Sequence, residues 1–290
     1  MDKKRIIIAL SIAAVLVPAF SLVPCRWPVG LIGMLIFAGI GTWEFYGLLN
    51  AGGIQTSTKW GIGSGLVFVA ATWFNALDKH HISYEGFRVS DNALWAVLLI
   101  VILSNFFRIL AYPDLRKGLE SCMGTILGLV YVPLLWSFVV RLFLLGDLAK
   151  PGWAAFYVIL CMKMSDSGGY FFGTRFGKNK LAPTISPKKS WEGLLGGFVF
   201  CIAVNVIWWM VSKGHINSAV PFSLVHAITL GFLFPIVGTL GDLVESMFKR
   251  AVDVKDSNTM VYGLGGILDM VDSILFAAPM LFIYIELFLK

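Results

Sequence analysis

A polar segment near the C-terminal end of the chain adjoins some of its most apolar sequence. Asp269 and Asp272 are three residues apart, so their carboxylates lie on one face if this segment is helical. Asp242 ends the preceding apolar run, and the intervening loop can fold it back beside them. Oxygen ligands suit Mg²⁺, which takes one or two carboxylates together with substrate phosphates. The segment therefore predicts a metal-dependent phosphate site.

Basic and small residues accompany these acids. Lys249, Arg250 and Lys255 supply positive charge for phosphate groups. A charge held near hydrocarbon costs roughly 2.5–3.5 kcal/mol on insertion scales, so such groups usually serve an ion or a polar substrate. A solvated loop at the membrane surface is the simpler alternative. The further candidate residues of this segment are Ser246, Asp256, Gly265 and Gly266.

A second polar stretch runs from residue 163 to residue 178. Asp166 and Ser167 precede the glycine pair Gly168 and Gly169. Adjacent glycines let backbone N–H groups approach a phosphate, and the carboxylate can meet a cation. The pattern is not a P-loop, because no G-x-x-x-x-G-K-[ST] run is present. The alternative is that Asp166 caps a broken helix and the glycines allow close helix packing.

A third stretch, Ser186-Pro-Lys-Lys-Ser-Trp-Glu-Gly193, directly precedes an apolar run. The ammonium groups of Lys188 and Lys189 and the hydroxyl of Ser186 can gather around phosphate oxygens, with Lys178 nearby in sequence. Basic residues beside a span also occur for topological reasons alone. Either interpretation places this stretch at the membrane surface.

The elements that must position these residues are membrane-spanning helices. The chain of 290 residues is 58% hydrophobic and 14% charged, and its mean hydropathy is +0.80. Its apolar runs are long enough to cross about 30 Å of hydrocarbon. These features predict an all-α integral membrane protein, a polytopic bundle of about nine transmembrane helices. The runs cover 6–23, 29–49, 60–77, 93–110, 121–145, 152–172, 193–211, 221–241 and 263–288, of which the sixth and eighth are the least well defined.

The distribution of Lys and Arg predicts the orientation. If the N-terminus is cytoplasmic, most of the Lys and Arg residues lie in inside loops. The two polar loops 173–192 and 243–262 are among these inside loops. The first run could instead be a signal peptide, but it exceeds the usual ~7–15-residue core. No linker divides the chain, so we treat it as one membrane domain. Residues 1–150 form an N-terminal scaffold region and residues 151–290 a catalytic region.

The remaining polar residues give weaker signals. The four cysteines are widely spaced and lie in or beside apolar runs, which indicates packing residues. The net charge of +6 fits anionic lipid headgroups, and no basic arm indicates nucleic-acid binding. Glu44, inside the second run, is either a hydrogen-bonded packing acid or part of the polar cavity. Its role stays open at this stage.

These three stretches together resemble the phosphatidate cytidylyltransferase family, the CDP-diacylglycerol synthases. That family has a signature of the approximate form S-x-x-K-R-x4-K-D, a spacer, then P-G-H-G-G-x-x-D-R-x-D-S. The family's D-S/T-G-x-Y-F-F-G-x-x-F-G-K and S-P-x-K-S/T-W-E-G stretches match 166–178 and 186–193. The residues that match the signature are Ser246, Lys249, Arg250, Lys255, Asp256, Gly263, Gly265, Gly266, Asp269, Asp272 and Ser273.

The chain departs from the signature at three positions. Leu264 stands where the family has histidine, Met270 where it has arginine, and Tyr262 where it has proline. A phosphatidate phosphate is already anionic near neutral pH. Its attack on a nucleotide phosphorus therefore needs charge neutralisation and in-line positioning more than proton removal. We expect activity to survive these replacements.

The resemblance implies that CTP and phosphatidic acid react to give CDP-diacylglycerol and pyrophosphate. It implies Mg²⁺ bound by Asp242 and Asp269, with Asp272 and Asp256 as further ligands or supports, and leaves a second cation open. The basic residues of both loops would hold phosphates, and Asp166 to Gly169 would complete the pocket. The expected setting is a bacterial cytoplasmic membrane with the active site inside, and a homodimer is plausible.

Two other functions remain open from the sequence. A CTP-dependent polyprenol or dolichol kinase also combines nucleotide use with basic, glycine-containing loops. A secondary transporter would use broken helices and carboxylates near the membrane midplane to bind an ion. The charges here cluster toward one face and no inverted repeat is evident in the sequence, which disfavours transport.

Overall fold

The computed structural model describes residues 27–78, 89–146, 152–217, 220–252 and 266–289. These residues form long helices and two short β-hairpins, without a larger sheet. The predicted first span, 6–23, lies outside the described residues. The helices are α2 (Trp27–Ala51), α3 (Thr58–Asp78), α4 (Asp91–Ile109), α5 (Leu115–Leu129), η1 (Val130–Leu134), α6 (Leu135–Phe143), α7 (Trp153–Phe176), α8 (Trp191–Val211), α9 (Leu224–Ala251) and α10 (Leu268–Phe288).

Seven helical segments in the described part of the chain are long and apolar enough to cross a membrane. They are α2, α3, α4, the continuous α5–η1–α6 segment, α8, α9 and α10. The predicted all-α membrane architecture is therefore confirmed, whereas the number nine is not. The sixth predicted run forms helix α7, but α7 is not one of the seven, and polar residues from Lys163 onward lower its hydropathy.

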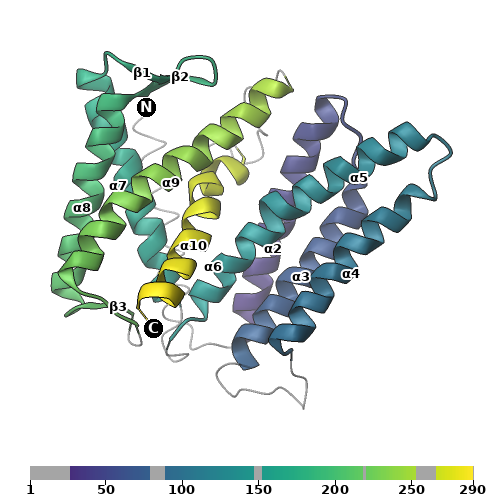
Figure 1. The fold of residues 1–290 in the computed structure, drawn as a ribbon, viewed down its shortest axis with the longest axis horizontal. Helices are drawn as coiled ribbons and strands as arrows, with labels where there is room; N and C mark the ends of the chain where they lie inside the picture. Colours follow the sequence, from purple (N-terminus) through teal and green to yellow (C-terminus); the bar gives the residue numbers. More distant parts are fainter. Residues whose placement is uncertain (1–26, 79–88, 147–151, 218–219, 253–265, 290) are drawn as a thin grey trace.

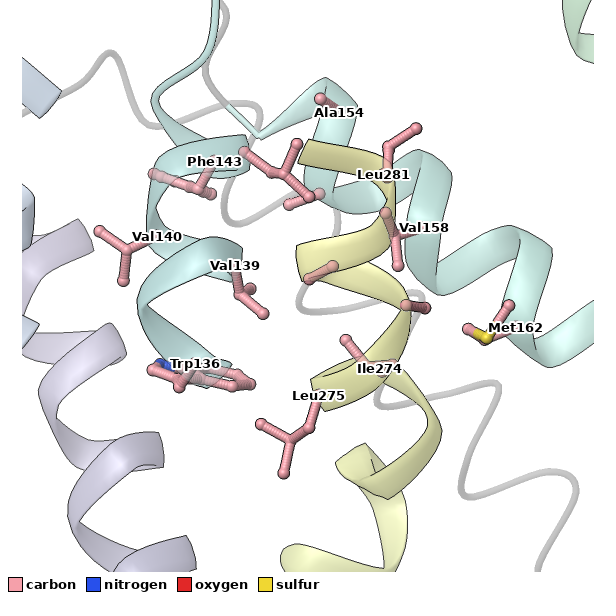
Figure 2. Packing of buried hydrophobic residues seen from close by; sticks show 14 of the residues in the cluster. Trp136, Val139, Val140, Phe143, Ala154, Val158, Met162, Ile274, Leu275 and Leu281 are labelled. Atoms are coloured by element: carbon pink, nitrogen blue, oxygen red, sulfur yellow. The ribbon is translucent and has the colours of Figure 1, made fainter. Parts of the chain in front are cut away.

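The last helix, α10, lies in the middle of the molecule. Figure 1 shows α7, α8, α9 and the hairpins on one side of it, and α2 to α6 on the other. Figure 2 shows how the core closes around α10: Val139 of α6 and Val158 of α7 lie on either side of Ile274 and Leu275. Because α10 joins the two groups of helices, residues at its start can meet residues from both.

The segment from Leu115 to Phe143 is a single span with a π-helical turn at its centre. Pro133 lies inside that turn. Proline has no N–H, and its ring clashes with the carbonyl four residues earlier, so one wider turn lets the helix continue. Tyr131 belongs to the same turn and is buried, with its ring against Phe45 and Phe248.

The two hairpins flank α8. Hairpin β1 (Lys180–Ala182) and β2 (Ser186–Ser190) precedes it, and β3 (His215–Asn217) and β4 (Val220–Pro221) follow it. Ser190 ends β2 and caps α8, because its hydroxyl accepts a hydrogen bond from the Gly193 N–H at 3.1 Å. The hairpins therefore lie at opposite ends of one span.

Candidate active site

A lysine between two carboxylates links the end of α9 to the start of α10. The Lys249 Nζ lies 3.1 Å from Glu245 Oε1, one turn earlier on α9, and also contacts Asp269 Oδ1 on α10. The three side chains are 13%, 5% and 18% exposed. Separating an ion pair this buried would leave an uncompensated charge away from water, so the contact is costly to break. The pair therefore positions Asp269.

Asp242 has its own lysine, supplied by the β1–β2 hairpin. Lys189 Nζ lies 2.7 Å from Asp242 Oδ2 and 3.3 Å from the Thr239 carbonyl oxygen. Both charged side chains are about one-quarter exposed. The hairpin that precedes α8 is thus held against α9 at the level of Asp242.

Asp272 completes the acidic side of this region. It is buried, and its carboxyl group lies beside those of Asp242 and Glu245. Its Oδ1 accepts the Ser273 backbone N–H at 2.6 Å. The backbones also approach closely, because a Cβ on Gly241 would lie 2.8 Å from the Asp272 carbonyl oxygen. The absence of a side chain at Gly241 therefore lets α9 and α10 bring their acids together.

Helix α7 adds a carboxylate, that of Asp166, and an ammonium group, that of Lys163, at the edge of the same region. Lys163 Nζ lies 3.8 Å from Asp166 Oδ2 and donates to the Met270 carbonyl oxygen at 3.4 Å. The two side chains are 49% and 45% exposed. We call Lys163, Asp166, Lys189, Asp242, Glu245, Lys249, Asp269 and Asp272 the polar cluster.

Glu44 binds the first turn of α10 from the other side of the molecule. Its carboxylate accepts the backbone N–H groups of Ile267 at 3.1 Å and Leu268 at 2.8 Å. The first N–H groups of a helix lack partners within it, and Ile267 at the cap position makes no side-chain cap. Glu44 is only 1% exposed. It is therefore a helix cap that fixes the helix carrying Asp269, and this settles the question left open by the sequence.

The structure corrects the prediction for Gly168 and Gly169. Both lie inside continuous helix α7, where their N–H groups belong to helical hydrogen bonds rather than to a phosphate-binding loop. A Cβ on Gly168 would lie 2.4 Å from the Gly196 carbonyl oxygen of α8. The alternative of close helix packing is therefore the right one. The Ser167 hydroxyl donates to the Lys163 carbonyl oxygen at 2.7 Å.

Most of the other expected residues that the structure describes are not seen in contact with the polar cluster. Lys188 and Lys189 are neighbours on β2, where successive side chains point to opposite faces, and Lys188 is exposed. Gly266 does join, because its N–H donates to Asp269 Oδ2 at 3.2 Å. Lys178 and Arg250 are exposed, Ser186 and Ser246 are half-buried, and Lys255, Asp256 and Gly265 lie outside the described residues.

Four residues of this region were not among the predicted site residues. Glu245 carried a usable signal, because it stands three residues after Asp242 and four before Lys249 on one helix. Lys163 stands three residues before Asp166 and could have been included for the same reason. Tyr131 packs against Phe248, the residue before Lys249. Glu44 and Tyr131 come from distant parts of the sequence, so no local pattern could place them here.

The donor set of the cluster fits a hard cation. The cluster brings together five carboxyl groups, all of them oxygen donors, and three ammonium groups. Within the described ranges no group of three or more His, Cys, Asp or Glu side chains has a metal-binding arrangement. Asp242 and Asp269 can provide the one or two carboxylates that Mg²⁺ needs when substrate phosphates supply the rest.

Comparisons with known proteins identify the family to which the chain is similar. The sequence model of the cytidylyltransferase family matches residues 3–288. The phosphatidate cytidylyltransferase of Haemophilus influenzae is 30% identical over 294 residues, covering 96% of each chain. That of Bacillus subtilis is 33% identical over 230 residues, 77% of this chain and 79% of the relative. That of Chlamydia pneumoniae is 31% identical over 255 residues, 85% and 79% of the two chains.

Proposed function

The chain belongs to the cytidylyltransferase family, and we propose that it is a phosphatidate cytidylyltransferase. It would transfer the cytidylyl group of CTP to phosphatidate, giving CDP-diacylglycerol and pyrophosphate. The observation that carries this proposal is the polar cluster itself, in which lysines from three elements meet carboxylates where α9 ends and α10 begins. The lysines can bind the substrate phosphates. A cation bound by the carboxylates can neutralise the remaining negative charge of those phosphates.

The reaction asks mainly for positioning. A phosphatidate oxygen attacks the α-phosphorus of CTP in line, that P–O bond forms, and the bond to the pyrophosphate oxygen breaks. The ammonium groups of Lys189 and Lys249 can stabilise the negative charge on the transferring group and on pyrophosphate. No strong base is required, since the attacking phosphate is already anionic. A leucine at residue 264, where the family has histidine, is therefore compatible with turnover.

We propose Mg²⁺ as the cofactor, with Asp242 and Asp269 as its protein ligands. When bound, the ion would offset charge on the reacting phosphates. Asp272 and Glu245 would support the ligands by fixing their neighbours, and Lys189 and Lys249 would keep Asp242 and Asp269 in place. The all-oxygen donor set of the cluster supports this assignment.

We also propose the membrane arrangement predicted from the sequence. It comprises about nine spans, a cytoplasmic N-terminus and an active site at the inner face of a bacterial cytoplasmic membrane. The basic β1–β2 hairpin has Lys180 and Lys188 exposed, and exposed Lys178 directly precedes it, which supports a cytoplasmic position for that end of the molecule. A homodimer remains part of the proposal.

Label transfer from CTP tests the function directly. Purified protein is incubated with phosphatidate, Mg²⁺ and CTP labelled at the α- or the γ-phosphorus, and chloroform-soluble label is counted. We expect label from α-labelled CTP only, and its loss when EDTA removes the metal. Transfer of γ-label would instead establish a lipid kinase, and nucleotide-independent accumulation of a solute in sealed vesicles would establish a transporter.

A further inference from the structure

Lys163 is the cation of the polar cluster that no predicted role explains. It follows Met162 on α7, and the Met162 side chain is buried in the hydrophobic core of the protein. A charge in such a helix is costly and usually serves an ion or a polar substrate. Its ammonium group lies beside α10 at Met270, the residue between the two acids Asp269 and Asp272. It therefore stands next to the proposed reacting centre.

The contacts of Lys163 leave it better able than the other two lysines to receive an anion. Lys189 and Lys249 each form a close ion pair, and their side chains are 25% and 13% exposed. The ion pair of Lys163 with Asp166 is long, at 3.8 Å, and the side chain is 49% exposed. Its other contact, at 3.4 Å, is the neutral carbonyl of Met270. Neither contact prevents a phosphate oxygen from approaching the ammonium group.

The sequence gives an independent reason to expect a cation here. The signature that the chain resembles has arginine directly after the first aspartate, and this chain has Met270 there. A methionine side chain cannot neutralise a phosphate. The ammonium group of Lys163 contacts the backbone of that same residue from a neighbouring helix. The positive charge that the chain lacks at residue 270 is therefore matched by the positive charge of Lys163 beside the same residue.

We propose that Lys163 binds a phosphate group of the substrates and replaces the charge of the arginine absent at residue 270. This inference rests on the proposed cytidylyl transfer. The phosphate belongs either to phosphatidate or to the triphosphate of CTP, which share the same anionic chemistry. Lysine acts on such a group as a point charge with three donors, so it needs no fixed orientation.

Kinetics with substitutions at both positions test the proposal. Lys163→Met keeps the length and removes the charge, and we expect kcat/KM to fall about tenfold to a hundredfold, the effect of one charged hydrogen bond. A higher KM for phosphatidate alone assigns the lipid phosphate, and a higher KM for CTP alone assigns the triphosphate. A fall in kcat alone assigns the transferring group. Lys163→Arg should retain most activity, and Lys59→Met, an exposed lysine outside the cluster, should retain all of it.

The decisive variant is Lys163→Met combined with Met270→Arg. If Lys163 replaces the lost arginine, the second substitution should restore most of the activity that the first removes. A helix-stabilising role would not be restored in this way. The proposal is overturned if Lys163→Met keeps kcat/KM within twofold of the unmodified protein, or if Met270→Arg restores nothing.

Two controls separate the possible failures. Gel filtration in detergent and the midpoint of thermal unfolding show whether a variant folds, and Lys163→Gln takes the place of Lys163→Met if that variant does not. If the unmodified protein transfers no α-label into lipid, the proposed function itself is wrong. If the unmodified protein is active, the kinetics of the variants test the role of Lys163 alone.

Discussion

At the scale of single residues, the site consists of lysines paired with the acids that would bind the metal. Lys189 with Asp242, and Lys249 with Asp269, each join a mostly buried ammonium group to a carboxylate. Before substrate arrives, each lysine neutralises its acid. When a cation and phosphates enter, the acids can turn to the cation and the lysines to the phosphates. The same pairs can therefore stabilise the empty site and bind the substrates.

A double substitution separates these two roles. Lys189→Met should destabilise the protein by about 1–3 kcal/mol, because Asp242 is left charged and unpaired. The double variant Lys189→Met/Asp242→Asn should recover most of that loss while remaining inactive. Thermal unfolding in detergent and label transfer measure the two effects. The exposed pair Arg116 and Glu120 is the control, and removing it should change neither property.

At the scale of helices, the start of α10 is fixed by a residue more than two hundred positions earlier in the chain. The Glu44 carboxylate accepts two N–H groups of the first turn and places a negative charge at the positive end of the helix. Asp269 directly follows Leu268, whose N–H donates to Glu44. The region 1–150 therefore shapes the site directly, and the boundary at residue 150 stays a prediction.

Glu44→Gln should weaken this cap, since an amide has one carbonyl oxygen in place of two carboxylate oxygens. We expect a loss of about 1–2 kcal/mol in stability and a lower kcat, because Asp269 loses its fixed position. Thermal unfolding and steady-state kinetics report both. Glu120→Gln makes the same change at an exposed position and should be silent. An unchanged kcat in Glu44→Gln would contradict the positioning role.

The packing of α7 against α8 makes a second prediction at this scale. Gly168→Ala places a methyl group 2.4 Å from a backbone oxygen, so α7 and α8 must separate. We expect a cost of about 1–3 kcal/mol. Gly63→Ala, also inside a helix but with nothing within 4 Å of the new Cβ, should not destabilise the protein. Equal unfolding midpoints for the two variants would show that the close contact is unimportant.

At the scale of the whole molecule, the two hairpins mark opposite ends of α8 (Figure 1). In the proposed orientation β1–β2 is cytoplasmic and β3–β4 is outside. Cysteine introduced at exposed Thr184 should react with a membrane-impermeant maleimide only in inverted vesicles, and cysteine at exposed His215 only in intact spheroplasts. The reverse pattern would overturn the orientation and place the polar cluster at the outer face.

The helices were predictable from the sequence because hydropathy is a local property. The placement of Asp269 and Asp272 one turn apart on the same helix was predictable because helical spacing is local too. The role of Gly168 was not, since glycine serves both phosphate-binding turns and close helix contacts, and only the position of α8 decides between them. Glu44 could not be assigned, because its partners Ile267 and Leu268 are distant in sequence and are backbone groups.

The most direct test of the account is the transfer of α-labelled phosphorus from CTP into lipid by the Asp269→Asn variant. This substitution keeps the size of the side chain and removes the charge that would bind Mg²⁺ and pair with Lys249. Asp114→Asn is the matched control, because Asp114 is exposed, its side chain caps α5, and asparagine caps equally well. We expect full transfer in the control and none in Asp269→Asn, with both proteins folded. Substantial transfer by folded Asp269→Asn would contradict the assignment of the polar cluster as the catalytic site.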